Sequence, residues 1–292
     1  MIPEIRRPEK VSHRNGLEQA IDRYKQSKKF LELSGNTQVF YSHDLTQFQE
    51  EYCQAHNILS VIQLTPEDVA NWRDQLRQGG YSPATINRKR ASLSGFLEEA
   101  QTQGMIRPDF KKSLPKYESV GKKQPGILTA EQADSLISKA KNLQDASLIL
   151  IALTTGASIT EIVNLNAEDI LRTEDGNTAI RFKGGIRKIQ TRTLQIDKKI
   201  GSKISEYIED SGLKPEDPLF KERHKGSRLT RNLVWFMLRD YGREIGVENL
   251  NTRMLRDTFI ARFPGTEQQL NKVLGRTSFG PSTLFPKSFQ TM

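Results

Sequence analysis

The stretch from residue 105 to residue 126 divides the chain, because it is rich in lysine, proline and glycine and poor in apolar residues. A segment of this composition buries too little apolar surface to form a core of its own. We therefore expect a basic linker at residues 107–126 between two folded domains, at 15–106 and 127–292, with residues 1–14 as a flexible arm. The 292 residues suffice for two domains that each bury a core.

The first domain is expected to be helical. Apolar residues recur at helical spacing from Leu17 to Leu33, and a second helix is expected at about 36–56. Thr65-Pro66 and Ser82-Pro83 each place a capping residue before a proline, which is the pattern of a helix start. The helix that begins after Ser82 is expected to end near Gln103.

The second domain is expected to combine helices with one small β element. Thr129 and Gln132 form the pattern of a capping box, and a buried helix is expected at about 146–155. Residues 178–182 and 189–196 alternate in polarity as two short strands. Further helices are expected at about 198–210, 230–245, 252–262 and 266–274. The expected fold class is therefore mainly α with a small β element.

The charge of the chain favours a polyanionic partner. Its 44 Lys and Arg residues outnumber its 35 Asp and Glu residues, which gives a formal net charge of +9. The region from Gly176 to Ile196 has no acid at all, and its basic residues are Arg181, Lys183, Arg187, Lys188 and Arg192. A balanced solvated face would carry both signs of charge, so this excess favours contact with nucleic acid.

The composition disfavours several other classes of protein. No run of about 18 apolar residues could span a membrane, and the N-terminal residues lack the apolar core of a signal peptide. The single cysteine, Cys53, excludes an internal disulfide, and the four scattered histidines argue against a zinc site. We expect no metal, no small-molecule cofactor and no membrane partner. The expected location is the cytoplasm, in association with the nucleoid if the protein is bacterial or archaeal.

Three short motifs in the last forty residues bear a family resemblance. Residues 252–263 read TRMLRDTFIARF, and VLGRTS at 273–278 and STLF at 282–285 follow. They resemble the tyrosine recombinases (phage integrases, Xer-like), in which the corresponding text reads roughly H-x-L-R-H-T-F-A, L-G-H-x-S and T-x-x-Y. The resemblance places four residues at the family's catalytic positions: Arg253 at the first histidine, Arg256 at the second arginine, Arg276 at a histidine or tryptophan, and Phe285 at the tyrosine that attacks DNA.

The helix expected after Ser82 carries a second resemblance. Residues 81–97, YSPATINRKRASLSGFL, are similar to the last helix of the family's helical, SAM-like core-binding domain, whose basic first turns lie on DNA. The resemblance implies DNA contact by Arg88, Lys89 and Arg90. Taken without the family, the same three residues would be a solvated basic face.

Residues 155–170, TGASITEIVNLNAEDI, carry the third resemblance, to the family's T-G-x-R-x-x-E-x-x-x-L-x-x-x-D-I. The family's first catalytic arginine falls on Ser158. The family also has a hairpin lysine that acts as general acid toward the leaving 5′ oxygen. Lys183 is the best candidate for it and Lys188 the second, because the register across the Gly184-Gly185 loop leaves both open.

The residues that strand cleavage requires are altered in this chain. Cleavage in this family needs a tyrosine nucleophile and two arginines that hold the phosphate. Phe285 has no nucleophilic atom, and Ser158 offers no charged bidentate clamp. Tyr241 is the last tyrosine of the chain and is expected to pack in the core of its own helix. We therefore expect a pseudoenzyme.

The expected function is that of a catalytically inactive homologue that clamps duplex DNA. It would act as a regulator, an architectural factor or a non-catalytic partner of an active recombinase, or would self-associate on DNA. The expected DNA contacts are Arg88, Lys89, Arg90, Lys183, Arg187, Lys188, Arg253, Arg256 and Arg276, although Arg253 and Arg276 could equally point to solvent. Two alternatives stay open, namely an active recombinase with an unrecognised nucleophile and a protein–protein scaffold that no longer binds DNA.

Overall fold

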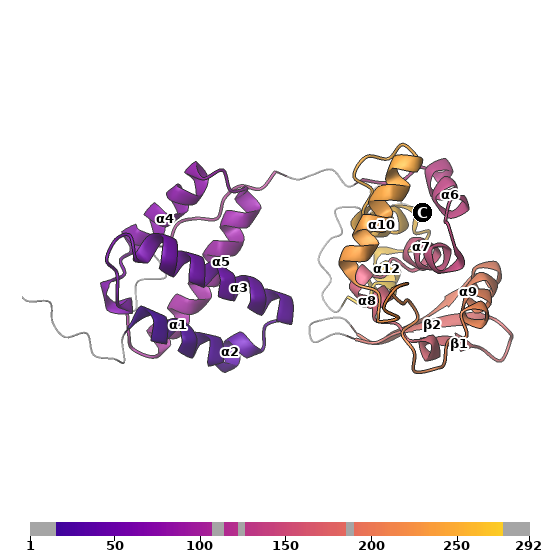
Figure 1. Cartoon of the computed structure of the whole chain (residues 1–292), viewed down its shortest axis with the longest axis horizontal. Helices are drawn as coiled ribbons and strands as arrows, with labels where there is room; N and C mark the ends of the chain where they lie inside the picture. The colour runs from indigo at the N-terminus through magenta and orange to yellow at the C-terminus, as the bar shows by residue number, and fades with distance from the viewer. Residues whose placement is uncertain (1–15, 107–113, 122–125, 185–189, 277–292) are drawn as a thin grey trace, which may run out of the picture. The chain divides into compact units, whose positions relative to one another are not determined.

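The computed structural model describes residues 16–106, 114–121, 126–184 and 190–276. The chain divides into two compact units, 1–122 and 123–292, which we call the first unit and the second unit and describe separately (Figure 1). None of the helices in the described ranges has the length and the apolar composition that crossing a bilayer requires.

The first unit is built of helices. Its α-helices are α1 (Leu17–Gln26), α2 (Lys28–Leu31), α3 (Gly35–Gln47), α4 (Pro66–Gln78) and α5 (Pro83–Thr102). A π-helical turn, η1 (Phe48–Cys53), continues α3, and a 3-10 turn, η2 (Val61–Gln63), precedes α4. The predicted helix starts at Thr65 and Ser82 are confirmed, since each side chain accepts a hydrogen bond from a backbone N–H of the first turn.

Aromatic side chains fill the core of the first unit. The rings of Phe48 and Trp72 meet edge to face with their centroids 4.8 Å apart, and those of Tyr24 and Phe30 do so at 5.2 Å. Helices α1, α3 and α5 pack together around this core. Large buried rings contribute much of the hydrophobic stabilisation of a small domain, so the first unit has a core that is independent of the rest of the chain.

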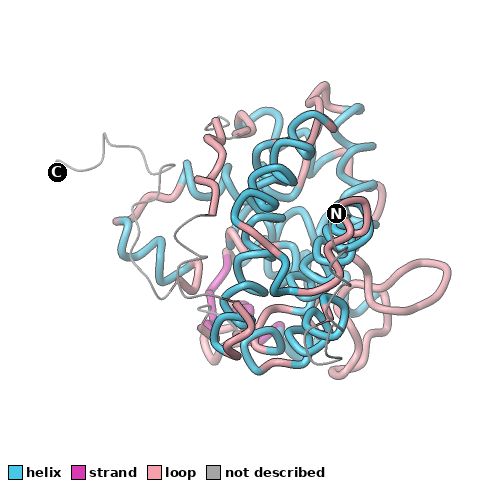
Figure 2. Tube along the Cα trace, turned by 90° about the vertical axis from the view of Figure 1, so that its left-hand side faces the viewer, coloured by secondary structure: helices cyan, strands magenta, loops and turns pink. Residues whose placement is uncertain are grey.

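The second unit combines helices with a small sheet. Its helices are α6 (Ala130–Ser138), α7 (Leu143–Thr155), α8 (Ile159–Val163), α9 (Lys198–Asp210), α10 (Arg231–Glu244), α11 (Thr252–Arg262) and α12 (Glu267–Val273), with a 3-10 turn, η4 (Ala167–Asp169). The strands β1 (Ile170–Arg172), β2 (Thr178–Phe182) and β3 (Arg192–Ile196) form an antiparallel sheet in that order. The sheet packs against α7 and α9 (Figure 1). Figure 2 shows how small the sheet is beside the helices.

The fold class is mainly α with a small β element, as predicted. The structure adds β1, a strand that the sequence analysis does not predict, and β3 begins at Arg192, later than expected. The predicted capping box of Thr129 and Gln132 is confirmed at the start of α6.

Helix α7 is the buried helix predicted at about 146–155, and it lies at the centre of the second unit. Its residues Leu148, Ile149 and Ile151 are buried, because α7 packs against α6, α9 and α11. The helix ends at Gly156, whose φ of +59° favours glycine. A Cβ at this position would lie 2.2 Å from Cδ1 of Phe259, so packing excludes a side chain as well. The chain turns there directly into α8.

Candidate nucleic-acid interface

The turn between α7 and α8 presents Ser158, the residue at the family's first arginine position. Ser158 is the N-cap of α8, and its Oγ accepts a hydrogen bond from the backbone N–H of Glu161 at 3.3 Å. The hydroxyl and the backbone N–H of Ser158 both donate to Oε2 of Glu161, each at 2.7 Å. A hydroxyl has one hydrogen to donate, so this capping box leaves Ser158 no side-chain donor for a phosphate oxygen.

Glu161 also receives a hydrogen bond from Arg192 on β3. Nη1 of Arg192 donates to Oε1 of Glu161, and its Nε donates to the backbone carbonyl of Val273 at the end of α12. The Arg192 side chain is 7% exposed, and its guanidinium lies 4.8 Å from the ring centroid of Phe182. Burial alone would raise the pKa of Glu161, but the hydrogen bonds from Arg192 and Ser158 outweigh it and lower this pKa. The carboxylate is therefore ionised at neutral pH.

Arg256 on α11 lies near the same carboxylate. Its Nη1 is 3.7 Å from Oε2 of Glu161, its side chain is 21% exposed, and it has no hydrogen-bond partner among the described residues. Burial lowers the pKa of Arg256, the charge of Glu161 opposes this, and the guanidinium groups of Arg276 and Arg192 lower it further. We call these three guanidinium groups the arginine cluster; Arg192 and Arg256 contact the carboxylate of Glu161, and the charge of Asp257 also acts on Arg256. Such an excess of positive charge favours an anion.

Arg253 and Arg276 differ in their exposure. Arg253 in the first turn of α11 is exposed, and its Nε lies 3.3 Å from Oδ2 of Asp257. Arg276 is half-buried, and its Nη1 lies 3.5 Å from Oδ1 of Asn271, at the limit of a hydrogen bond. Both side chains therefore retain N–H groups for an external partner. The predicted site residues Arg187, Lys188 and Phe285 lie outside the described residues.

Lys183 follows β2 directly and is held by two acids. Its Nζ lies 3.2 Å from Oδ2 of Asp169 and 3.3 Å from Oε1 of Glu168. The hydrogen bond to Asp169 raises the pKa of Lys183. Arg181 forms an ion pair with the same carboxylate at 2.9 Å. A lysine held in this way gives up its proton less readily, so these contacts disfavour a role as general acid.

The structure corrects the prediction that Lys89 contacts DNA. Lys89 is 2% exposed, and its Nζ donates to Oδ1 of Asp44 at 3.1 Å and to Oε1 of Gln47. A buried ammonium group requires such partners. Arg88 pairs with the same Asp44, and its guanidinium lies 5.1 Å from the ring centroid of Phe40. Lys89 is thus a structural residue, and part of the hydrogen-bonding capacity of Arg88 is used by Asp44 inside the first unit.

The structure also corrects the extent of the predicted linker. Residues 114–121 pack on the first unit rather than hanging free, and Tyr117 stacks 3.9 Å from the guanidinium of Arg90. Asn87 on α5 exchanges two hydrogen bonds with the backbone of Glu118, at 2.7 and 2.9 Å. This segment therefore covers the face of α5 that presents Asn87 and Arg90. The other predicted linker residues up to 125 lie outside the described residues.

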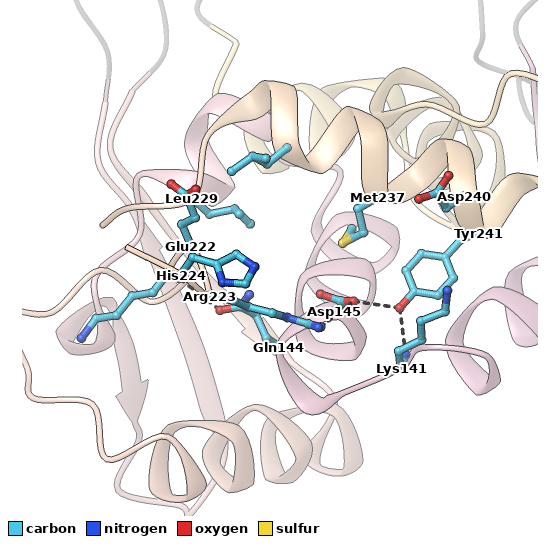
Figure 3. Close-up of a pocket in the computed structure, with 12 residues that line it drawn as sticks. Lys141, Gln144, Asp145, Glu222, Arg223, His224, Leu229, Met237, Asp240 and Tyr241 are labelled. Atoms are coloured by element: carbon cyan, nitrogen blue, oxygen red, sulfur yellow. Dashed lines mark hydrogen bonds and ion pairs between the residues drawn. The ribbon is translucent and has the colours of Figure 1, made fainter. Parts of the chain in front are cut away.

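A cavity of about 300 Å³ lies between α10, the start of α7 and the loop at 221–224 (Figure 3). Tyr241 lines it, and its hydroxyl donates to Oδ2 of Asp145 and accepts from the backbone N–H of Lys141, both at 2.8 Å. Burial raises the pKa of Tyr241 to about 12. The prediction that Tyr241 packs in the core is confirmed, because its side chain is buried and fully hydrogen-bonded.

Sequence reasoning missed Arg192 as a member of the site. In the sequence, Arg192 is one of five basic residues between Gly176 and Ile196, and it does not align with an arginine position of the family motifs. A signal was available in the alternation of β3, because Arg192, Leu194 and Ile196 lie on one face of a strand and the last two are apolar. An arginine on an inward face requires a buried acid, which the structure identifies as Glu161.

Comparison with protein families matches both units of the chain. Residues 127–273 match the phage integrase family, and residues 21–104 match the phage integrase N-terminal SAM-like domain. Tyrosine recombinase XerC of Roseiflexus sp. (strain RS-1) is 26% identical over 269 residues, which cover 87% of this chain and 83% of that protein. A protein of Caldanaerobacter subterraneus subsp. tengcongensis named as a candidate tyrosine recombinase is 32% identical over 243 residues, 80% of this chain and 79% of its own.

Solved structures share the fold. The lambda integrase dimer bound to a COC′ core site matches with a TM-score of 0.70 and 15% identity, over 90% of this chain and 75% of that one. XerH bound to its difH substrate matches with a TM-score of 0.65 and 23% identity, over 90% of this chain and 77% of that one. The family match over residues 127–273 and the 32% identity to the Caldanaerobacter protein show that the chain belongs to the phage integrase family of tyrosine recombinases.

Proposed function

We propose that the chain binds duplex DNA and does not cleave it. The observation that carries the proposal is the state of Ser158, whose hydroxyl caps α8 and donates its hydrogen to Glu161. In this family an arginine at that position holds the phosphate as charge moves onto its oxygens. Phe285 brings no hydroxyl to the nucleophile position. Tyr241 offers no substitute, because a buried phenol with a raised pKa is a poor nucleophile at neutral pH.

Binding of DNA is supported by charge and by kinship. Arg253 and Arg256 lie on α11 and Arg276 follows α12, and each of these side chains retains N–H groups for an external partner. The relatives lambda integrase and XerH have been solved in complexes with their DNA sites. A protein that holds duplex DNA in this way without cutting it would serve as a regulator, as an architectural factor or as the non-catalytic partner of an active recombinase.

The binding half of the proposal is tested by a gel-shift titration at several salt concentrations. If about 6–10 phosphates are neutralised, the affinity for a duplex should fall roughly 10³–10⁵-fold between 50 and 200 mM salt. Absence of binding at the lowest salt would contradict the proposal and favour a protein–protein scaffold. Recovery of bound genomic fragments from cells would then show which sequences the protein occupies.

The catalytic half is tested with a nicked suicide duplex, on which a tyrosine recombinase traps itself covalently. We expect no adduct that survives boiling in detergent. Phe285→Tyr alone should also give none, because Ser158 still lacks a guanidinium for the phosphate and Arg253 stands where the family has a histidine. An adduct formed by the unchanged protein would overturn the proposal and establish an active recombinase with another nucleophile.

A further inference from the structure

Arg192 has one buried nitrogen, Nη2, that its structural role does not explain. Its Nε and Nη1 tie β3 to the end of α12 and to Glu161 of α8. Its Nη2 is buried and has no hydrogen-bond partner among the described residues. A donor left unpaired in the interior destabilises the fold, and it does so more when it is charged. Such a group calls for a reason, and a ligand that pairs with it is one.

The position of Arg192 relates it directly to the missing arginine. Glu161 holds Ser158 through Oε2 and Arg192 through Oε1. The guanidinium of Arg192 on β3 therefore contacts the same carboxylate that hydrogen-bonds to Ser158. Nη1 of Arg256 lies 3.7 Å from Oε2 of the same carboxylate. A guanidinium from a different element of the fold therefore stands beside the position where the family has its first arginine.

We propose that Arg192 supplies the guanidinium that position 158 lacks and completes, with Arg256 and Arg276, a pocket for one phosphate group of the DNA backbone. This inference rests on the proposed function, because it names the residues of the same phosphate site. The phosphate oxygens would accept hydrogen bonds from Nη2 of Arg192 and from the unused N–H groups of Arg256. Nη2 is shielded from solvent in the free protein, so a neighbouring side chain must move aside when the phosphate enters.

The competing explanation is that Arg192 only neutralises Glu161 and fastens β3 to α12. That role accounts for Nη1 and Nε but leaves Nη2 unexplained. The two explanations differ in what a bound anion does. A phosphate pocket predicts that phosphate stabilises the protein through Arg192, whereas a purely structural arginine predicts no such dependence.

The experiment uses the full chain, as wild type, Arg192→Lys and the double variant Arg192→Gln with Glu161→Gln. The double variant removes both charges together and so avoids an unpaired buried carboxylate if the single change fails to fold. Arg172→Gln is the matched control, because Arg172 is an exposed arginine of β1 in the same sheet. The probes are inorganic phosphate, compared with chloride at equal ionic strength, and a DNA duplex between 50 and 200 mM salt.

We expect phosphate at saturating concentration to raise the melting temperature of the wild type and of Arg172→Gln by about 2–4 °C, and to leave that of both Arg192 variants unchanged. The DNA affinity of the Arg192 variants should fall about tenfold, and the slope of log affinity against log salt should decrease by about 1. Folded Arg192 variants that keep the wild-type phosphate shift and salt slope would overturn the inference. If phosphate stabilises the wild type through Arg192 but no duplex binds, the pocket stands and the proposed function falls.

Discussion

The basic residues of α5 in the first unit and the arginine cluster of the second unit differ in how fully their charges are paired. In the first unit, Lys89 is buried against Asp44 and Gln47, and Arg90 is covered by Tyr117. In the second unit, Arg192 and Arg256 share the carboxylate of Glu161, and the charge of Arg276 also acts on Arg256. Basic residues with internal partners stabilise a fold, whereas basic residues in excess of their partners attract an external anion. Under the proposed function, burial and pairing, rather than the number of basic residues, predict which side chains contact DNA.

Separating the units tests this comparison most severely. Residues 1–122 and 123–292 expressed apart should each bind a duplex about 10²–10⁴-fold more weakly than the whole chain, because the second contact is then no longer intramolecular. The second unit alone should bind at least about tenfold more tightly than the first alone, since its arginines Arg253, Arg256 and Arg276 retain N–H groups for an external partner. Fluorescence anisotropy at low salt measures all three affinities, and an equimolar mixture of the halves is the control. Tighter binding by the first unit would reverse the comparison.

Substitution of Asp44, the acid that pairs with the buried Lys89, should lower the stability of the first unit and leave DNA binding unchanged. Asp44→Asn leaves the buried Lys89 without its counter-charge and should cost about 3–5 kcal/mol of unfolding free energy. Asp22→Asn on α1 is the matched control, because Asp22 pairs with Lys25 at an exposed site and should cost less than about 1 kcal/mol. Urea denaturation of the isolated first unit, followed by Trp72 fluorescence, measures both. Equal costs for the two variants would show that Lys89 does not depend on Asp44.

Single arginine substitutions sharpen the comparison at the level of affinity. Arg256→Gln should weaken duplex binding about 10–100-fold, the range expected for losing a hydrogen bond to a charged group. Arg90→Gln should change it by less than about threefold, because Arg90 already stacks on Tyr117. Gel-shift titrations at one salt concentration compare the two variants after circular dichroism has confirmed their folding. A larger loss for Arg90→Gln would place the principal phosphate contacts in the first unit.

The smallest expected effect is a dependence of stability on pH in the second unit. The hydrogen bonds of Glu161 lower its pKa below the ordinary value of 4.5, so its contribution is complete above that value. The contribution is lost as the pH falls through the lower pKa of the folded state. Melting temperatures between pH 3 and 7 should show wild type above Glu161→Gln by about 2–4 °C near neutrality, with the gap closing below about pH 4.5. A gap that widens on acidification would contradict the ionised carboxylate.

The features of the fold that the sequence predicted are local ones. The caps at Thr65, Ser82 and Thr129 depend on residues within three positions, so short patterns identify them. The central helix α7 is recognisable from its unbroken apolar run. The strand β1 escapes prediction because Ile170–Arg172 is too short to display alternation.

The site was predictable only where a family motif fixes a position. The motifs single out Arg256 and Ser158, and both of these residues contact Glu161 in the structure. Lys89 and Arg192 could not be interpreted in the same way, because their partners Asp44 and Glu161 lie 45 and 31 residues away in the sequence. Whether a charge is buried depends on which distant segment folds against it, and no local pattern carries that information.

The serine cap of α8 has a further consequence for how a catalytic position can be lost. An N-cap serine is worth about 0.5–2 kcal/mol relative to alanine, and Ser158 makes the full reciprocal cap with Glu161. The path of the turn is set two residues earlier by Gly156, so residue 158 can change without bending the backbone. If the chain does not cleave DNA, as proposed, serine at this position exchanges activity for stability. A lineage that no longer needs cleavage would have a thermodynamic reason to keep serine here and no structural reason to restore arginine.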